Sequence, residues 1–511
     1  MSRRDLLVGV DVGSSGIKTA VFDCSGKRLG EGRRDNHPDQ PRPGVAEYDG
    51  NRMLQATVAS ICEAIEMAGA GKADVAAIAF DGMISGVMGV DSQWNPTTPY
   101  TTPLDMRFGD QLDRITETHG EEIRRLTGSG MAVIGPKIAW LREAFPDDFA
   151  RTEAFVTATG FVVGKLAGLR ATDAFIDSTY LWTTGLSDTL NNCWSEELCE
   201  AHGVDVKQLP KIVRPMDIVG RVTEVFGEAT GLGAGVPIVA GAGDQSAGFV
   251  GAGMTRAGIL ADVAGTYPIL ALSTDSFVPD LKDRRIELFP SPVSGQFHAC
   301  FIINGGGLTH HWFGQQFGEG EQLGEGEYGE LFARLDTAAA QMSPGCDGLF
   351  FSPHLGGRVC PIRTNMKGAW VGFTWTHQRS HFYRALLESI AFEHALGLRA
   401  LRKLFPAQEP DEIRGFGGGS KSALWNQIKA DVLGLPYRAM DEADQAVWGD
   451  AVLAGCAVGL FDDLTTAWEL APASGKVYRP DPSCHTKYEQ LLQTYEEMTT
   501  PLENVFDRLV L

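Results

Sequence analysis

The same pattern occurs at the start of the chain and again near its middle: a short apolar run, a turn, and a second apolar run. Residues 6–10 are apolar, 11–16 have the composition of a turn, and 17–22 are apolar again. The same order returns at 259–272, and a third apolar run follows at 297–303. Short apolar runs separated by turn residues are typical of β-hairpins. Each half is therefore predicted to begin with a β meander, and the first strand does not lead into a helix.

Helical patterns and further apolar runs alternate after each meander. In the first half, residues 52–67 have helical spacing and 76–80 form an apolar run. In the second half, 381–404 have helical spacing and 412–416 form the apolar run. Alternation of this kind is typical of α/β domains. The sequence therefore predicts two duplicated α/β domains.

The length of the chain supports the same division. A single hydrophobic core seldom exceeds about 250–300 residues, and this chain has 511. Hydrophobic residues make up 43% and charged residues 21%, as in an ordinary globular protein. We place the boundary at the glycine-rich segment 251–253, which predicts domains at 1–252 and 253–511.

The charge balance restricts the partners that the surface can bind. Lys and Arg total 44 against 65 Asp and Glu, a formal net charge of −21. This charge disfavours binding to nucleic acid or to an anionic membrane and favours a small-molecule site. No segment has the basic helix-turn-helix pattern that a DNA-binding repressor would need.

The expected location follows from the cysteines and the apolar runs. The nine cysteines include no C-x-x-C pair, which is typical of a reduced chain. The first apolar run is too short for a signal peptide, and no run approaches the roughly 18 residues of a membrane-spanning helix. We therefore expect a cytoplasmic protein without membrane partners.

The first hairpin turn carries groups that bind phosphate. Its backbone N–H groups can form an anion-binding concavity to which the hydroxyls of Ser14 and Ser15 add donors. Lys18 on the returning strand adds a cation, and Asp11 could hold Mg²⁺ directly or through water. The Walker A pattern is absent, because Ile17 stands where a glycine is required. The alternative is an ordinary glycine turn in which Asp11 only caps the loop.

Three further glycine-containing turns are candidates for a functional site. Asp244 follows an apolar strand in the segment 241–248, where it could cap a helix or act as a base for a substrate hydroxyl. Gly265-Thr266 lies in the second hairpin, where it could hold phosphate from the opposite side. The run 417–420 (GGGS) could provide a flat surface for a base and ribose, or simply begin a helix.

Six segments, taken in chain order, resemble one protein family. They are 11–23 (DVGSSGIKTAVFD), 241–253 (GAGDQSAGFVGAG), Gly265-Thr266, Gly305–Gly307 with Trp312, 368–388 (GAWVGFTWTHQRSHFYRALLE) and 417–434 (GGGSKSALWNQIKADVLG). Together they span nearly the whole chain. The sequence thus resembles the FGGY family of carbohydrate kinases, and most closely its xylulose kinases.

The resemblance implies an α/β fold of two duplicated ribonuclease-H-like, actin-like ATPase domains that close on a sugar and MgATP. It implies that Asp244 is the catalytic base and that Asp11 positions Mg²⁺. The implied substrate-binding residues are Ser85, Asp105, Arg107, Asp244 and Gln245. The implied ATP-binding residues are Gly13, Ser14, Ser15, Lys18, Gly265, Thr266, Gly307, His311, Gly418, Gly419 and Ser422. A homodimer is a further implication.

The chain departs from the family pattern at several positions. Ser85 stands where xylulose kinases have the histidine of GQMHG. Tyr267 follows Gly265-Thr266 where Ser or Gly is commoner, and Trp448 and Asp450 replace small apolar residues at a helix start. The resemblance favours a ketopentose such as D-xylulose as acceptor. A polyol, another ketose or a sugar acid is an alternative acceptor. Two alternative functions also stay open: a sugar-responsive binding protein without turnover, and an actin-like ATPase acting as chaperone or filament.

Overall fold

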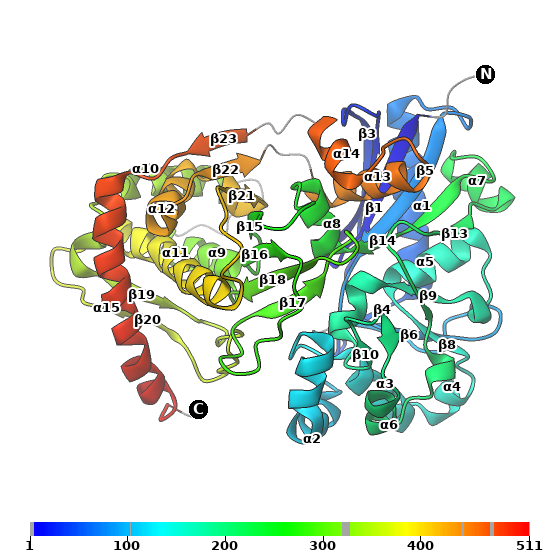
Figure 1. Ribbon diagram of the computed structural model, residues 1–511, viewed down its shortest axis with the longest axis horizontal. Helices are drawn as coiled ribbons and strands as arrows, with labels where there is room; N and C mark the ends of the chain where they lie inside the picture. Colours follow the sequence, from blue (N-terminus) through cyan, green and yellow to red (C-terminus); the bar gives the residue numbers. More distant parts are fainter. Residues whose placement is uncertain (1–4, 103, 319–327, 441–443, 471–474, 510–511) are drawn as a thin grey trace.

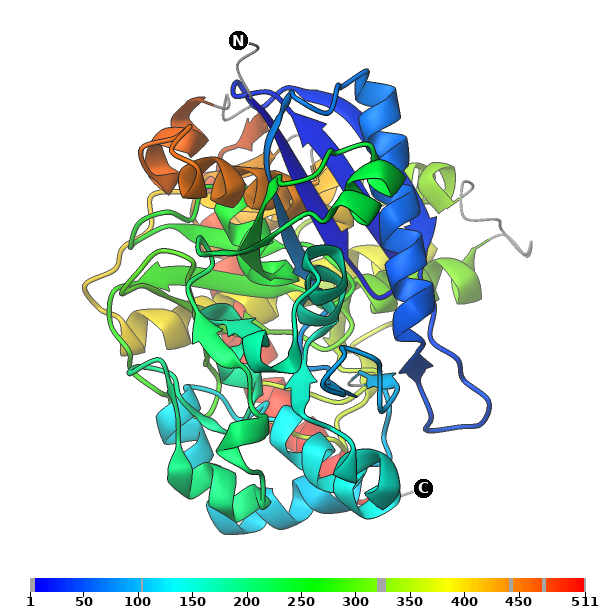
Figure 2. The same cartoon turned by 90° about the vertical axis from the view of Figure 1, so that its right-hand side faces the viewer.

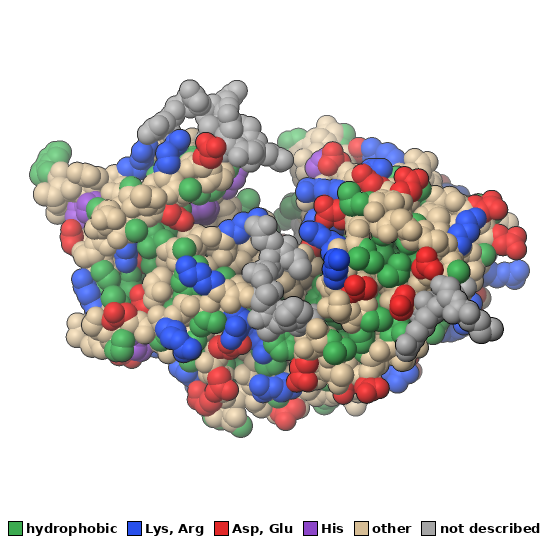
Figure 3. All heavy atoms as spheres, turned by 90° about the horizontal axis from the view of Figure 1, so that it is seen from above, with side chains coloured by type: hydrophobic (Ala, Val, Ile, Leu, Met, Phe, Trp, Pro, Cys, Tyr) green, Lys and Arg blue, Asp and Glu red, His purple; other side chains and the backbone are tan. Residues whose placement is uncertain are grey.

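Two α/β bodies lie side by side in the computed structural model, the first half of the chain on the right of Figure 1 and most of the second half on the left. The structure describes residues 5–102, 104–318, 328–440, 444–470 and 475–509. Viewed from above, the surface is notched between the two bodies (Figure 3).

A six-stranded sheet forms the centre of the N-terminal body. In spatial order its strands are β13 (Ile218–Arg221), β14 (Pro237–Gly243), β5 (Val75–Gly82), β1 (Leu6–Val12), β2 (Gly16–Phe22) and β3 (Arg28–Asp35). The strands β1, β2 and β3 pair antiparallel, whereas β1, β5 and β14 run parallel. The antiparallel pairing confirms the predicted meander.

The C-terminal body repeats this topology. Its sheet contains β17 (Glu287–Pro290), β18 (Phe297–Ile302), β16 (Ile269–Thr274), β15 (Leu260–Val263), β21 (Ile413–Phe416), β22 (Tyr437–Met440) and β23 (Gly475–Tyr478). Here β15, β16 and β18 pair antiparallel, and β15, β21 and β22 run parallel. The predicted duplication is therefore confirmed, and β17 is an addition without counterpart in the first sheet.

Helices cover both sheets. Those of the first half are α1 (Gly50–Ala68), α2 (Gly109–Thr127), α3 (Ile134–Ala144), α4 (Pro146–Ala150), α5 (Ala158–Ala167), α6 (Glu196–His202), α7 (Glu224–Thr230) and α8 (Asp244–Gly251). Those of the second half are α9 (Gly306–Phe317), α10 (Tyr328–Ala339), α11 (Arg379–Leu404), α12 (Ala423–Leu433), α13 (Gln445–Ala457), α14 (Leu464–Leu470) and α15 (Pro482–Phe506). Figure 2 shows α1 running along the N-terminal sheet. None of the helices in the described residues is long and apolar enough to cross a membrane.

Helix α13 packs on the sheet of the other half. Val447, Trp448 and Val452 share one buried apolar cluster with residues of β1, β2 and β5. The approach is so close that a Cβ on Gly9 would lie 1.9 Å from the Val447 carbonyl oxygen. We propose 1–252 and 253–511 as the two domains. Helix α13 of the second domain packs on the sheet of the first domain.

Candidate active site

The turn between β1 and β2 lies open at the cleft side of the N-terminal sheet. Ser14 and Ser15 are exposed, and the Tyr48 hydroxyl donates a hydrogen bond of 2.7 Å to the Ser14 carbonyl oxygen. A Cβ on Gly13 would lie 2.8 Å from the Gly16 carbonyl oxygen and 3.1 Å from Oδ1 of Asp11. Glycine at position 13 therefore lets the turn fold tightly over the Asp11 carboxyl group.

Asp11 and Lys18 lie opposite each other on the paired strands β1 and β2. Lys18 Nζ lies 3.6 Å from Oδ2 of Asp11 and donates a hydrogen bond of 2.7 Å to Oδ2 of Asp444. Burial raises the pKa of Asp11 to about 6, with Lys18 acting in the opposite direction. Oδ1 of Asp11 is buried and accepts no hydrogen bond from the described residues.

That unpartnered oxygen suits a divalent cation. Within the described residues, no group of three or more His, Cys, Asp or Glu side chains is arranged to hold a metal ion. A cation at Asp11 would therefore take most of its ligands from phosphate and water. Mg²⁺ binds in this way, through one or two carboxylates, phosphate oxygens and water.

Asp244 is the first residue of α8, and Gly243 rather than Asp244 is the N-cap of that helix. The Asp244 Oδ1 atom accepts a hydrogen bond of 2.7 Å from the backbone N–H of Gln245. Desolvation, and to a smaller extent the charge of Asp11, raises the pKa of Asp244 to about 7. A carboxyl group with this pKa can accept a proton efficiently near neutral pH. The Oε1 atom of Gln245 is buried and unpartnered among the described residues.

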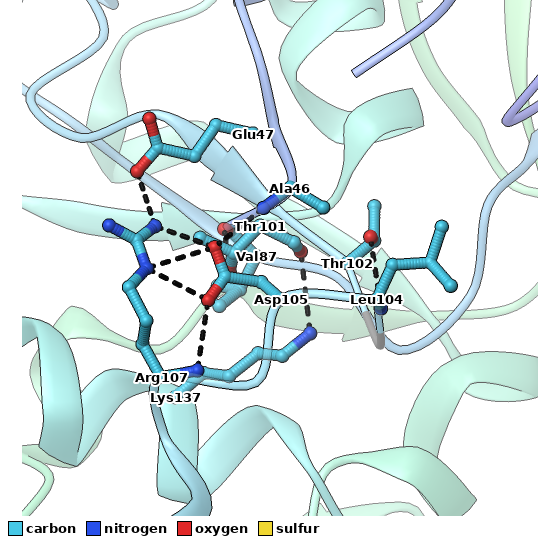
Figure 4. Close-up of polar contacts among 9 residues, drawn as sticks. All are labelled: Ala46, Glu47, Val87, Thr101, Thr102, Leu104, Asp105, Arg107 and Lys137. Carbon is cyan, nitrogen blue, oxygen red and sulfur yellow. Dashed lines mark hydrogen bonds and ion pairs between the residues drawn. The ribbon is translucent and has the colours of Figure 1, made fainter. Parts of the chain in front are cut away.

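Asp105 and Arg107 form an ion-paired cluster with Glu47, which the sequence did not single out (Figure 4). Arg107 Nε lies 2.9 Å from Oδ1 of Asp105, and its Nη2 atom hydrogen-bonds both Asp105 Oδ2 and Glu47 Oε1. The guanidinium carbon lies 4.5 Å from the centre of the Trp140 ring. Burial opposes ionisation of Asp105, yet its hydrogen bonds with Arg107 lower its pKa below the usual range.

Ser85 lies in a loop that is hydrogen-bonded by a buried lysine, Lys137. Its backbone is left-handed, with φ of 64°, and its carbonyl oxygen accepts a hydrogen bond of 2.7 Å from Lys137 Nζ. Lys137 also reaches the Thr101 carbonyl oxygen at 3.4 Å. Burial lowers the pKa of Lys137 to about 7. A lysine within the apolar stretch 136–141 was the available signal for this role in the sequence.

Short strands connect the turn at 13–15, the predicted phosphate turn, to the segment that contains Asp105 and Arg107. In β4 (Glu47–Tyr48) and β7 (Tyr100–Thr101), Glu47 pairs with Thr101 and Tyr48 with Tyr100. Tyr48 contacts the phosphate turn, as described above, and the Tyr100 hydroxyl bonds the Met83 carbonyl oxygen at 3.1 Å. A Cβ on Gly243 would lie 2.7 Å from Ile84. The loop of Ser85 therefore adjoins the start of α8, where Asp244 lies.

The C-terminal body contains a cavity of about 730 Å³. All seven ATP-binding residues predicted in the second half line it, namely Gly265, Thr266, Gly307, His311, Gly418, Gly419 and Ser422. A Cβ on Gly307 would lie 2.4 Å from the Gly265 carbonyl oxygen, whereas a Cβ on Gly418 would meet nothing within 4 Å. Glycine is thus required where α9 meets the second hairpin, and it leaves an open surface at 418.

Other residues of the same cavity were not expected from the sequence. His310 stacks on Phe332 with ring centroids 3.8 Å apart, and both line the cavity with Trp425. Asp336 accepts hydrogen bonds from the hydroxyls of Ser422, at 2.6 Å, and Tyr383, at 3.0 Å. These groups form an aromatic and acidic end of the cavity, which suits a nucleoside better than a phosphate chain.

Comparison with known proteins identifies the family of the chain. The model of the N-terminal domain of the FGGY family of carbohydrate kinases matches residues 6–251, and that of the C-terminal domain matches 270–458. The xylulose kinase of Staphylococcus epidermidis is 25% identical over 505 residues, covering 96% of each chain. The autoinducer-2 kinase of Klebsiella pneumoniae is 26% identical over 513 residues, covering 96% of this chain and 93% of that one.

Solved structures agree on the fold. The gluconate kinase from Lactobacillus acidophilus superposes with a TM-score of 0.88 at 23% identity and covers 99% of both chains. This likeness confirms the predicted two-domain ribonuclease-H-like, actin-like fold.

Proposed function

This chain belongs to the FGGY family of carbohydrate kinases, and we propose that it transfers the γ-phosphoryl group of ATP to a hydroxyl of a small sugar or polyol. The observation that carries the proposal is the placement of Asp244. This partly buried carboxyl group lies beside Asp11 and the Ser85 loop, and desolvation raises its pKa to about 7.

In the proposed reaction, Asp244 accepts the proton of the attacking hydroxyl as its oxygen bonds to the γ-phosphorus, while the bond from the γ-phosphorus to the β–γ bridging oxygen breaks and ADP leaves. Transfer of a phosphoryl group depends on in-line positioning and on neutralisation of charge. The N–H groups of the turn at 13–15, with Ser14, Ser15 and Lys18, would bind the phosphate from the N-terminal side. Gly265 and Thr266 would bind it from the other side, and closure of the domains would exclude water.

Asp11 would hold Mg²⁺, which supplies positive charge to the phosphate oxygens when bound. The role of Lys18 follows from its position. It is ion-paired with Asp444 of the second half as well as with Asp11 of the first, so it would join both halves at the phosphates.

For the acceptor, we propose a ketopentose such as D-xylulose. The xylulose kinases among the similar proteins support this choice, while the autoinducer-2 and gluconate kinases keep another ketose, a polyol or a sugar acid as alternatives. Ser85, Arg107 and Gln245 are the residues we propose to contact it, and Asp105 is proposed to hold Arg107 in position. A homodimer and a cytoplasmic location remain predictions.

The test is an assay of ADP release with MgATP and a panel of acceptors: D-xylulose, D-ribulose, L-ribulose, L-xylulose, glycerol, erythritol and gluconate. We expect release that depends on one acceptor or a few related ones. ADP release without any acceptor would instead indicate an ATPase. Acceptor binding without release, measured by thermal shift, would indicate a binding protein that has lost turnover.

A further inference from the structure

The cluster of Arg107 has more negative than positive charge. Its guanidinium group bonds the carboxylates of both Asp105 and Glu47, as Figure 4 shows. Lys137 is the other nearby cation, but its side chain is 0% exposed and its hydrogen bonds go to backbone carbonyl oxygens. Lys137 therefore offers an acceptor no hydrogen bond, and burial lowers its pKa to about 7, which weakens its positive charge near neutral pH.

The exposed fractions show which of these groups an acceptor can reach. The side chain of Asp105 is 1% exposed, whereas those of Arg107 and Glu47 are 20% and 25% exposed. Asp105 also accepts hydrogen bonds from the backbone N–H groups of Ala46 and Arg107. Asp105 thus holds Arg107 in place, while Arg107 and Glu47 form the accessible surface.

That surface offers one donor and one acceptor. Among the described residues, Arg107 Nη1 and Glu47 Oε2 have no hydrogen-bond partner, because the contacts of the two groups use Nε, Nη2 and Oε1. A hydroxyl group both donates and accepts, so it can bond both atoms. A carboxylate only accepts, so it would bond Nη1 while facing the charge of Glu47.

We propose that Glu47, by sharing Arg107 with Asp105, restricts this site to uncharged polyhydroxy acceptors and excludes sugar acids. The inference rests on the proposed function, since it concerns the acceptor of that reaction. Glu47 acts here as a specificity residue. Position 47 is 60 residues from Arg107 in the chain, and the antiparallel pair β4–β7 brings it to the site.

The experiment compares acceptors matched in carbon number: D-xylulose with D-xylonate, glycerol with glycerate, and sorbitol with gluconate. ADP release gives kcat/KM, and calorimetry without ATP gives binding. For the wild-type protein we expect the neutral member of the productive pair to be favoured by roughly tenfold or more, since like charges at a binding site strongly disfavour association.

The variant Glu47→Gln removes the charge and keeps the shape of the side chain. We expect it to move the ratio of neutral to acid kcat/KM toward the acid by about tenfold. Asp39→Asn is the matched control, because Asp39 lies in the same loop, pairs with Glu47 only through the backbone, and directs its carboxylate to exposed Arg52. We expect this control to leave the ratio unchanged.

Two results would overturn the inference while leaving the kinase in place. One is wild-type protein that uses an acid as well as its neutral partner, a result that stands even if Glu47→Gln does not fold. The other is a folded Glu47→Gln protein that loses activity equally on both members, which indicates a structural role. Absence of both release and binding with every compound would instead overturn the proposed function itself.

Discussion

The hairpins that begin the two halves have the same strand pairing but different charges at equivalent positions. Asp11 and Asp262 each lie one residue before the end of their strand, and both are buried. Across the antiparallel pair, Asp11 faces Lys18, whereas Asp262 faces Leu270. Duplication of the fold thus preserved an aspartate in both halves but changed what surrounds it.

The residue beside each aspartate on the adjacent parallel strand also differs. Asp11 lies beside Asp81 of β5, while Asp262 lies beside Gly415 of β21. In the second half, Lys429 Nζ and the Tyr437 hydroxyl both donate to Oδ2 of Asp262. Burial opposes ionisation of Asp262, yet Lys429 lowers its pKa below the usual range.

The two environments have opposite consequences. Asp11 has a pKa raised to about 6 and pairs with Lys18, whose side chain is 40% exposed, whereas Asp262 is held by an ion pair with no exposed surface. We infer that acidic residues of the first half serve the reaction. We propose that Asp262 of the second half serves stability, and that this half binds the nucleotide largely through glycine-rich turns.

The largest expected effect is the loss of turnover when the proposed base in the first half is replaced. Asp244→Asn removes the proposed base, and we expect kcat to fall by about 10²–10⁴-fold, the usual contribution of general base catalysis. ATP binding, measured by calorimetry, is expected to stay within about twofold because the nucleotide turns are unchanged. Turnover at the wild-type rate would remove Asp244 from the mechanism.

Asp262→Asn is the matching change in the second half. It leaves Lys429 charged and buried without its partner, so we expect the free energy of unfolding to fall by about 3–5 kcal/mol. Urea denaturation measures this loss. The double variant Asp262→Asn with Lys429→Met should recover part of it, since no unpaired charge then remains. A stable single variant with reduced turnover would contradict the comparison.

The pH dependence of the rate is the next expected effect. The pKa of Asp244 is raised to about 7, and the base must be ionised, so kcat/KM is expected to fall about tenfold per pH unit below that value. A rate that is constant between pH 5 and 8 would argue against this assignment. The measurement is the acceptor-dependent release of ADP over that range.

Stability should respond to pH with opposite signs in the two halves. The raised pKa of Asp244 contributes stability that is present at low pH and is lost as the pH rises from about 4 to about 7. The lowered pKa of Asp262 contributes stability that is present above its unfolded pKa and is lost on acidification. Urea titrations of each Asn variant against wild type, at several pH values, separate these two contributions.

The smallest expected effects are on the kinetic constants of two serine variants, one from each half. Ser422→Ala removes the hydrogen bond to Asp336 and the one that Ser422 accepts from the backbone N–H of Trp425 at the start of α12. We expect the KM for ATP to rise about fivefold or more with little change in kcat, in line with the loss of these hydrogen bonds. Ser14→Ala lies at the phosphate turn and should lower kcat more than it raises KM. Equal effects of both changes on KM would remove the distinction between the halves.

Several parts of the site were predictable because their signals are local. Apolar runs and turn residues mark both hairpins, and the glycine segments at 265, 307 and 417–419 mark the turns around the nucleotide cavity. Glu47 had no such signal, and neither did Asp336, because each acquires its role from a partner distant in the chain. Lys137 stood out only as a charge in an apolar stretch.

The sequence by itself determined the duplicated α/β architecture and its turns, because hydrophobic periodicity and glycine conformational freedom act over a few residues. The tertiary structure decided which acids have a pKa that suits the proposed reaction. Desolvation and charge pairing depend on distances in space, which set the pKa of Asp11 and Asp244 high and that of Asp262 low. The ion pair between Arg107 and Glu47 likewise forms only in the folded protein, and the proposed choice of acceptor depends on it.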